Sequence, residues 1–420
     1  MSLSKRKRKK IDTRPFDRLK VPPKQNCLIM PFMWAYCFFT TRNYKLKIDK
    51  INMKDLKPPY LILATHHSFM DFLVTPLAIA PHLANYISEL EGFEYYGEWP
   101  YRQIGCLGTR KFVDDLALIQ NIKKVIDRKG IMVIYPEARY ANVGTNSKIE
   151  HSVGKLVKLL KVPVVVLNMR GNYLQSPIWN LEFRKQARLH ATIQKVFEPD
   201  QIKEMKAEEI VDRLQEYLSY DEYLYQWDNK IAITYEERAK GLHLPLYKCK
   251  VCGKDFAMDS HKDVLYCKSC KNTYSMDEFG RLFSAKDEEK TSPIHIPDYY
   301  EWQRSEVEKE IDEGNYHLDI KVHIESLPNA VNFIDLNTGN LKHTEKGFEL
   351  HFMDYGKTEK ETLFFSSKTM TSVHTEYNYR GMGPCITLST LDNTYFLFPL
   401  EEGFSATKIQ FATEYLNKRG

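Results

Sequence analysis

The chain has 420 residues, which exceeds one ordinary domain, so two or three domains are expected. Hydrophobic residues make up 43% of the chain and charged residues 27%, a balance that excludes a largely disordered protein. The formal net charge is +5, but removing the six consecutive basic residues at 5–10 leaves −1, so the basicity belongs to one short segment.

Residues 1–24 are expected to form a basic, disordered arm. Its run of lysines and arginines would attract a polyanion, either nucleic acid or anionic lipid headgroups. Each basic residue near an anionic membrane contributes about 1 kcal/mol, so the run could hold a peripheral protein weakly. The other interpretation is a solvated tail without a partner.

An apolar segment follows at residues 27–39, which is short and contains Pro31. No stretch of roughly 18 uninterrupted apolar residues exists, so a membrane-spanning helix is not expected. The segment is rich in aromatic residues, which favour a bilayer interface, and no small-residue cleavage site of a secretion signal follows it. Contact with a membrane surface and an amphipathic helix that covers the core are both open interpretations.

The region from about residue 45 to 196 alternates apolar runs with amphipathic segments of helical length. Strands separated by helices indicate an α/β layer in which much of the sheet is parallel. The predicted strands are 60–64, 131–135, 162–167 and a more polar 189–196 that could lie at an edge, and the predicted helices are 115–129, 150–161, 204–217 and 220–240.

The composition changes near residue 247. Two cysteine pairs lie within 245–284, and a charged stretch with two prolines begins a linker and helix over 285–314. Short apolar runs separated by turn residues then predict strands, with one last helix at 405–416. Several strands followed by one helix is the order of PH-like domains, so a mostly β domain of that kind is expected at 315–420.

The segment after the first buried strand carries the candidate catalytic residues. Ser68 and Asp71 are spaced like a capping box, which would place Asp71 in the first turn of a helix and His66 on the preceding loop. The loop can then bring the imidazole to the carboxylate, whereas on one continuous helix the two would point apart. A histidine with a carboxylate partner is a general base near neutral pH, which a hydroxyl needs to attack a thioester.

His66 and Asp71 resemble the His-x4-Asp motif of the glycerolipid (lysophospholipid) acyltransferase family, and three further segments resemble its other blocks in the right order. These are Gly108–Asp114, Tyr135–Arg139 and Val162–Val166. The resemblance implies an acyltransferase domain at 25–240 that moves a fatty acyl group from acyl-CoA or acyl carrier protein to a lysophospholipid-type hydroxyl, as in phospholipid biosynthesis. It assigns the role of base to His66 and that of partner to Asp71. The neighbouring His67 is the competing base and is expected to be a packing or hydrogen-bonding residue.

The resemblance also implies where the phosphate of the acceptor would bind, because the family holds it with the second and third blocks. Glu137 matches directly, but Asp115 stands where the family has the second-block arginine, and the third block has Ala138 for glycine and its arginine one position early. Phosphate binding depends on where a guanidinium sits, so these changes affect the acceptor more than the chemistry. The candidate acceptor-binding residues are Gly108, Arg110, Lys111, Phe112, Glu137 and Arg139.

Cys249, Cys252, Cys267 and Cys270 form two Cys-x-x-Cys pairs separated by 14 residues, with Gly253 free to turn after the first pair. Four thiolates at this spacing predict a structural Zn²⁺ site, iron being the other metal that such ligands accept. The other cysteines are scattered, which favours a reducing compartment over a disulfide framework. This basic ribbon would bind protein or nucleic acid, or serve as a spacer between domains.

Together these features predict an α/β acyltransferase domain, followed by a small zinc ribbon and a mostly β C-terminal domain. The expected location is cytoplasmic, peripheral on the inner face of the membrane, with a lipid acceptor and an acyl donor as partners. The alternative is a membrane-associated adaptor whose acyltransferase fold has drifted and which binds a protein partner through its ribbon or β domain. Nucleic-acid binding is a third interpretation, and the near-neutral body argues against it.

Overall fold

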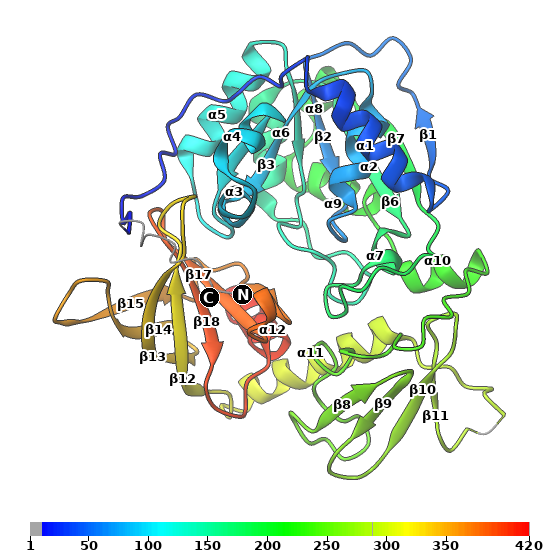
Figure 1. Ribbon diagram of the computed structural model, residues 1–420, viewed down its shortest axis with the longest axis vertical. Helices are drawn as coiled ribbons and strands as arrows, with labels where there is room; N and C mark the ends of the chain where they lie inside the picture. Colours follow the sequence, from blue (N-terminus) through cyan, green and yellow to red (C-terminus); the bar gives the residue numbers. More distant parts are fainter. Residues whose placement is uncertain (1–10, 288, 420) are drawn as a thin grey trace, which may run out of the picture.

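The computed structural model describes residues 11–287 and 289–419, so the basic run at 5–10 lies outside the described residues. Figure 1 shows an α/β domain at the top, a small β sheet at the lower right and a second β domain at the lower left. Within the described ranges, none of the helices has the length and apolar character that crossing a bilayer requires.

The α/β domain is built on one seven-stranded sheet in the order β1-β7-β6-β2-β5-β3-β4. Strands β6, β2, β5, β3 and β4 are parallel, as expected, whereas β7 is antiparallel to β6 and parallel to β1. The strand that was expected at an edge of the sheet, β7, is the second strand from that edge, because β1 pairs with its outer side. The bounds are β1 Lys47–Ile51, β2 Tyr60–Ala64, β3 Ala84–Glu89, β4 Cys106–Thr109, β5 Ile131–Ile134, β6 Val164–Arg170 and β7 His190–Phe197.

Helices cover this sheet, and the two amphipathic ones expected between strands are present as α5 and α6. Asp115 is the N-cap of α5, where its carboxylate accepts the N–H groups of Ala117 and Leu118, which gives this acidic residue a structural role. The bounds are α2 Asp71–Ile79, α3 Leu90–Tyr96, α4 Glu98–Gln103, α5 Leu116–Asp127, α6 His151–Leu160, α7 Asn172–Gln175, α8 Pro199–Glu204, α9 Ala207–Tyr217 and α10 Glu222–Asp228.

The helix predicted over 220–240 is wrong beyond α10. Lys230 has a positive φ of 50°, which ends the helix, and the chain then runs without regular structure toward the ribbon. Ile231 and Ile233 are buried in the core there, and the Ile233 N–H donates to the carbonyl of Glu278. Packing against the ribbon thus overrides the local helical pattern.

The cysteine-rich region forms a four-stranded antiparallel sheet, and the C-terminal domain forms a seven-stranded antiparallel sheet closed by a helix, as expected for a mostly β domain. Its PH-like character stays a prediction. The first sheet has the bounds β8 Met258–His261, β9 Val264–Cys267, β10 Thr273–Met276 and β11 Leu282–Ser284, and is followed by α11 Ile296–Asp312. The second has β12 Leu318–Ser326, β13 Ile334–Thr344, β14 Gly347–Met353, β15 Lys360–Ser366, β16 His374–Glu376, β17 Cys385–Ser389, β18 Thr394–Pro399 and α12 Ala406–Arg419.

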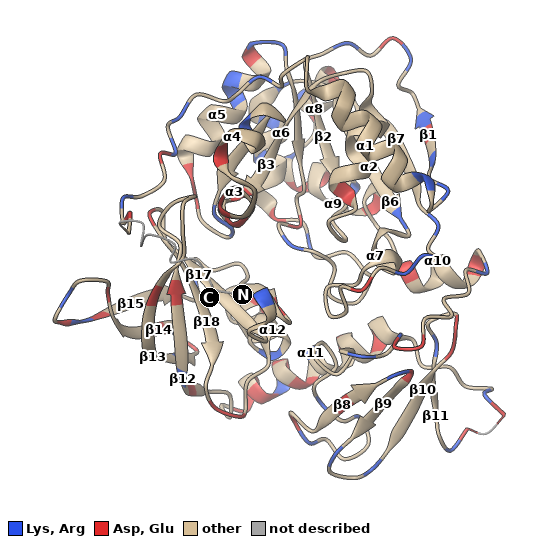
Figure 2. Ribbon diagram, in the orientation of Figure 1, with Lys and Arg blue, Asp and Glu red and all other residues tan. Residues whose placement is uncertain are grey.

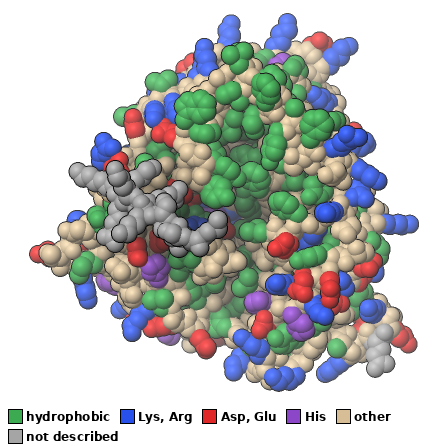
Figure 3. All heavy atoms as spheres, viewed as in Figure 1, with side chains coloured by type: hydrophobic (Ala, Val, Ile, Leu, Met, Phe, Trp, Pro, Cys, Tyr) green, Lys and Arg blue, Asp and Glu red, His purple; other side chains and the backbone are tan. Residues whose placement is uncertain are grey.

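The apolar segment expected at 27–39 forms α1, Met30–Arg42, which has no charged residue before Arg42 (Figure 2). One side is buried through Met30 and Cys37, whereas Phe32 is 77% exposed and Phe39 64% exposed. The helix therefore covers the core and also presents apolar side chains outward. Figure 3, in the same orientation as Figure 1, shows hydrophobic side chains gathered on the upper part of the molecule, over the α/β domain.

Residues 11–24 lack helix and strand but are held against the body, so this part of the expected arm differs from a disordered tail. The Phe16 N–H donates to the carbonyl of Pro328 (2.8 Å), and the Asn329 amide donates to the carbonyl of Asp12 (2.7 Å). Phe16 also packs against a small core that joins α3 to the C-terminal domain. The N-terminal segment thereby ties the two domains together.

Candidate active site and metal centre

His66 and Asp71 lie at the carboxyl end of β2, where the chain turns into α2. His66 Nδ1 lies 3.0 Å from Asp71 Oδ2, and Asp71 is completely buried. The same carboxylate oxygen accepts the N–H groups of His67 (2.6 Å) and Ser68 (3.1 Å). The helix begins at Asp71 rather than just after Ser68, yet the carboxylate still reaches back to the turn, so the pair forms as the spacing indicates.

Asn172 completes the surroundings of Asp71 and is not apparent from the sequence. Its Nδ2 donates to Asp71 Oδ1 at 2.7 Å from a position 101 residues along the chain. Asn172 opens α7 after β6, and the N–H of Gly171 beside it donates to the buried Glu222 carboxylate (2.7 Å). The Asp71 carboxylate is therefore oriented from both sides, and it can fix the tautomer of His66.

Three aromatic side chains surround the His66 imidazole. Tyr135 stacks on it with ring centres 4.3 Å apart, Tyr140 lies at 4.5 Å, and Phe72 meets it edge-on at 6.1 Å. The His66 side chain keeps 11% of its surface exposed, and its Nε2 has no hydrogen-bond partner among the described residues. A reacting group can therefore approach Nε2 in a largely apolar setting.

His67 is fully buried against the Tyr220 ring, with ring centres 4.1 Å apart. Burial lowers the pKa of His67 to about 4, and neither ring nitrogen has a partner among the described residues. A neutral imidazole closed off from solvent cannot exchange protons with a substrate. The structure therefore places His67 in the packing role.

Glu137, expected to contact the acceptor, binds the protein itself. One carboxylate oxygen accepts the N–H of His66 (3.2 Å), the other accepts the N–H of Ser147 (2.7 Å), and the Tyr220 hydroxyl donates to both. Burial raises the pKa of Glu137 to about 8, opposed by these hydrogen bonds. Its observed contacts hold the backbone of His66.

The other candidate acceptor residues lie at the junction with the C-terminal domain. Gly108 on β4 is a packing position, since a Cβ there would come within 2.8 Å of Leu90 and Phe16. The ring of Phe112 lies beneath the Arg139 guanidinium at 5.8 Å. Arg110, Lys111 and Arg139 all contact the C-terminal domain.

Ala138 occupies a left-handed backbone conformation with φ of 54°, at the place where the resembled motif has glycine. A side chain there costs about 1 kcal/mol, partly offset by the greater flexibility of an unfolded glycine. Ala138→Gly should therefore raise the free energy of unfolding by about 0.5 to 1 kcal/mol, measured by chemical denaturation. An unchanged or lower stability would contradict this.

Glu414 on α12 joins two arginines: its Oε1 lies 2.6 Å from Arg139, and its Oε2 pairs with Arg304 of α11. Burial alone would raise the pKa of Glu414, but the two cations outweigh it and lower the pKa to about 2. Because the folded pKa lies below the usual 4.5, the stabilisation is complete above pH 4.5 and is lost as the pH falls toward 2. Glu414→Gln should therefore lose about 3 kcal/mol of stability at pH 6 and much less at pH 2.5, measured by denaturation at both pH values.

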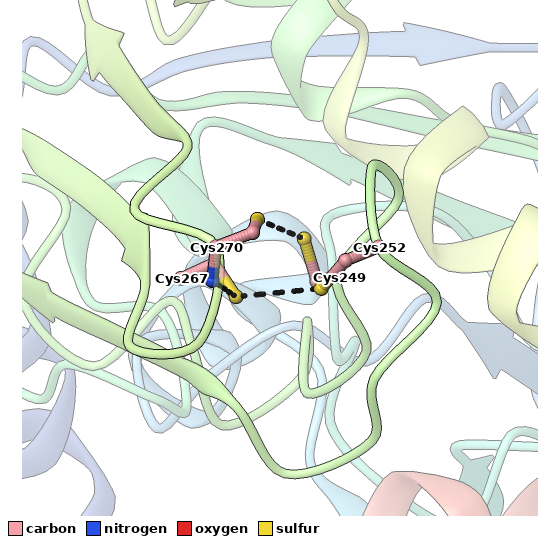
Figure 4. Close-up of side chains that lie close together, drawn as sticks. All are labelled: Cys249, Cys252, Cys267 and Cys270. Carbon is pink, nitrogen blue, oxygen red and sulfur yellow. Dashed lines mark hydrogen bonds between the residues drawn. The ribbon is translucent and has the colours of Figure 1, made fainter.

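The four predicted metal ligands come together, as Figure 4 shows: Cys249 and Cys252 lie in the turn before β8, Cys267 ends β9, and Cys270 lies in the turn after it. The Sγ atoms of Cys249 and Cys270 are 3.7 Å apart, those of Cys252 and Cys267 are 3.8 Å apart, and all four lie within 4.8 Å of one another. A tetrahedron of thiolates about 2.3 Å from a central metal has edges of about 3.8 Å. These separations are far too long for disulfides, so the group can hold a metal ion.

The two Cys-x-x-Cys turns, or knuckles, have the same backbone hydrogen-bond pattern. The N–H of Gly253 donates to the carbonyl of Cys249, and the N–H of Lys271 donates equivalently to that of Cys267, at 2.9 and 3.0 Å. Both turning residues have positive φ, 70° for Gly253 and 62° for Lys271. The sequence indicates the first turn through its glycine but not the second.

Comparison with known proteins adds little to this geometry. No protein-family model matches the chain, and no curated protein matches it. Among solved structures, the chain is similar to the crystal structure of the 1-acyl-sn-glycerophosphate (LPA) acyltransferase PlsC from Thermotoga maritima, with 16% identity and a TM-score of 0.37. The match covers 45% of this chain and 79% of that one. A TM-score of this size does not establish a shared fold, so a function has to rest on the site.

Proposed function

We propose that the α/β domain transfers a fatty acyl group from a thioester, acyl-CoA or acyl carrier protein, to the hydroxyl of a lipid. The observation that carries this proposal is the buried His66–Asp71 pair, in which Nδ1 faces the carboxylate and Nε2 has no described partner. This arrangement suits a general base, because the carboxylate stabilises the imidazolium that forms.

In the proposed reaction, the hydroxyl oxygen attacks the thioester carbonyl carbon while His66 Nε2 takes the hydroxyl proton. The C–O bond forms and the C–S bond breaks when the tetrahedral intermediate collapses. The imidazolium then returns its proton to the departing thiolate, so the histidine ends neutral. The aromatic walls of Tyr135, Tyr140 and Phe72 favour an acyl chain and limit the water that would otherwise hydrolyse the thioester.

Exposed aromatic side chains next to the site support a peripheral position on the cytoplasmic face of a membrane. Phe69 packs against Phe72 at 6.1 Å and against Tyr96 at 6.5 Å, which extends the aromatic path from His66 outward. Tyr95 is 77% exposed and Trp99 67% exposed, and the apolar face of α1 adds to them. Aromatic side chains of this kind partition into the headgroup region of a bilayer, where a lipid acceptor resides.

We further infer that the four cysteines hold a structural zinc ion. Four thiolates fill a tetrahedral shell and leave no open position for a substrate, so the role is to stabilise the ribbon. No step of the acyl transfer involves it.

The test is an acyl-transfer assay with radiolabelled acyl-CoA and, separately, radiolabelled acyl carrier protein as donors, and a panel of lipid hydroxyl acceptors. His66→Ala should lower transfer by at least about 10²-fold, because general-base catalysis contributes 10²- to 10⁴-fold. His190→Ala is a matched control, since His190 on β7 also pairs with an aspartate, Asp49 on the edge strand β1, at 2.7 Å. The control should keep full activity.

An adaptor function is the second candidate, and the contacts of Arg110, Lys111 and Arg139 with the C-terminal domain favour it. In that case no acceptor would be acylated above the level of His66→Ala with either donor. Binding of a protein partner to the ribbon or the β domain, together with this lack of transfer, would then favour the adaptor function over the enzymatic one.

A further inference from the structure

The three cations that sequence matching assigns to an acceptor phosphate are occupied by other protein groups. Arg139 is 6% exposed and directs its guanidinium at the C-terminal domain. Its Nη1 donates to Ser372 Oγ and its Nη2 to Glu414 Oε1, both at 2.6 Å. The Glu414 carboxylate neutralises its charge, so Arg139 is not available to an anionic ligand.

Arg110 is bound in the same way, though by neutral groups. Its Nη2 donates to the carbonyls of Pro328 (2.6 Å), Asp392 (2.9 Å) and Leu327 (3.3 Å), all in loops of the C-terminal domain. The residue is 8% exposed, and burial lowers its pKa to about 10. The three carbonyls occupy Nη2, whereas the buried Nε has no hydrogen-bond partner among the described residues.

Lys111 lies between acidic groups of both domains. Its Nζ forms an ion pair with Glu89 of the α/β domain and lies 3.2 Å from His374 Nε2, which is itself 3.0 Å from Glu376 Oε1. His374 is held neutral, because burial and then the charge of Lys111 lower its pKa well below its usual value. The Glu89 carboxylate thus already matches the positive charge of Lys111.

This cluster lies beside the reacting histidine. Tyr140 follows Arg139 in the chain and its ring is 4.5 Å from that of His66. Burial raises the pKa of Tyr140, and the charges of Glu89, Asp71 and Glu376 raise it further. The immediate surroundings of the His66 ring are therefore aromatic, and the basic residue next to Tyr140, Arg139, already has protein partners.

The contact between the domains is part of the core rather than a loose cover. Leu90 of α3 packs with Leu327, Phe396 and Phe398 in one buried cluster. Nearby, the buried Asn142 donates to the Tyr300 hydroxyl (2.8 Å) and to Gln410 Oε1 (2.7 Å). Exposing the arginines to a ligand would open this apolar core and leave buried polar groups without partners.

We propose that the acceptor is a neutral lipid alcohol, such as a monoacylglycerol or a long-chain alcohol, with no phosphate beside its reacting hydroxyl. The inference rests on the proposed acyl transfer and narrows its substrate class. A phosphate near His66 would find Arg110, Lys111 and Arg139 already bound to other protein groups. A neutral hydroxyl needs no such cation, and the aromatic walls accept its apolar chain.

The first test compares two acceptors that carry the same oleoyl chain, monooleoylglycerol and oleoyl lysophosphatidic acid, in the same neutral detergent micelles. The full chain should acylate the neutral lipid with a kcat/KM at least 10-fold higher. Equal or preferential use of lysophosphatidic acid would overturn the proposal.

The second test asks whether the C-terminal domain is instead a removable cover over a phosphate site. Glu414→Gln releases the charge of Arg139 while keeping a side chain of the same shape, and Ser372→Ala removes a neutral partner of the same arginine as the control. Neither variant should gain activity on lysophosphatidic acid. A 10-fold gain confined to Glu414→Gln would overturn the proposal in favour of an autoinhibited phosphate site.

A binding measurement separates failure of the proposed acyl transfer from failure of the proposed preference for a neutral lipid. If no acceptor is acylated, the proposed acyl transfer is wrong. Retention of the two tritiated lipids on the purified chain then tests the preference by itself. Tighter retention of monooleoylglycerol than of lysophosphatidic acid supports a neutral ligand at the site. Equal or tighter retention of lysophosphatidic acid overturns it.

Discussion

Acyl transfer by the Asp71→Asn variant should fall by about 10²- to 10³-fold while the protein keeps its fold. The loss comes from the missing charge, because an amide cannot stabilise the imidazolium that forms on His66 during proton transfer. The reduction is measured as kcat in the acyl-transfer assay, with the fold checked by circular dichroism.

The surroundings of Asp71 explain why the loss should stay below the about 10⁴-fold known for wrong-tautomer variants of catalytic triads. The oxygen that faces His66 also accepts two backbone N–H groups, so the asparagine should keep its oxygen on that side. Its new NH₂ group would then face Asn172, whose own Oδ1 has no partner in the described part of the chain and becomes an acceptor if that amide turns over. The tautomer of His66 is thereby retained.

Glu222→Gln is the matched control for this prediction. Glu222 is also fully buried and accepts the Gly171 N–H next to Asn172, but it does not contact His66. Its activity should equal that of the wild type. The combined variant His66→Ala with Asp71→Asn should lose no more than His66→Ala alone, since the two residues act as one unit. Additive losses would contradict the assigned pair.

The centre of the sheet and the contact between His66 and Asp71 could be predicted from the sequence because both depend on local pattern. The run Tyr60–Ala64 is apolar on both faces, as a strand in the middle of a parallel sheet must be, and it leads directly into the His66 turn. The strands β3 and β4 were missed, since their residues mix polar and apolar types without clear alternation. Their pairing depends on neighbours that local pattern does not reveal.

The residues that orient and enclose the site could not be predicted from the sequence, for a different reason. Asn172 meets Asp71 only through the pairing of β2 with β6, and Tyr140 meets His66 only because the loop after β5 folds back. Neither side chain belongs to a spacing motif. A polar residue directly after a buried parallel strand is the one signal that could have indicated Asn172, because such strand ends gather at one edge of the sheet.

Contacts between domains account for the largest change to the predicted site. Arg139 and Glu414 are 275 residues apart, and Arg110 reaches carbonyls more than 200 residues away. A sequence motif alone suggests that these cations are available to a ligand, whereas in the fold each of them binds other protein groups. The contact between His66 and Asp71 was therefore easier to predict than the partners of these cations.

Removing the metal should lower the free energy of unfolding by several kcal/mol, because structural zinc binds small modules with about 10–16 kcal/mol near pH 7. Elemental analysis should find one zinc per chain, and a chelator or Cys252→Ser should lower the melting temperature. Cys27→Ser is the control, since Cys27 is also exposed but lies outside the cluster. A metal-free protein whose melting temperature is unaffected by chelator would contradict the assignment.

The loss of stability on metal removal should extend beyond the ribbon, because α11 is hydrogen-bonded to the turn that carries Cys249 and Cys252. The Tyr299 hydroxyl accepts the N–H of Lys250 (2.9 Å) and donates to the carbonyl of Lys248 (2.8 Å). From the same helix, Arg304 pairs with Glu414, which in turn pairs with Arg139. Loss of the metal releases the knuckle and with it the support of α11, so hydrogen exchange in α11 and α12 should rise before the α/β sheet is affected. The metal is therefore expected to hold in place the contacts that keep Arg139 from an acceptor.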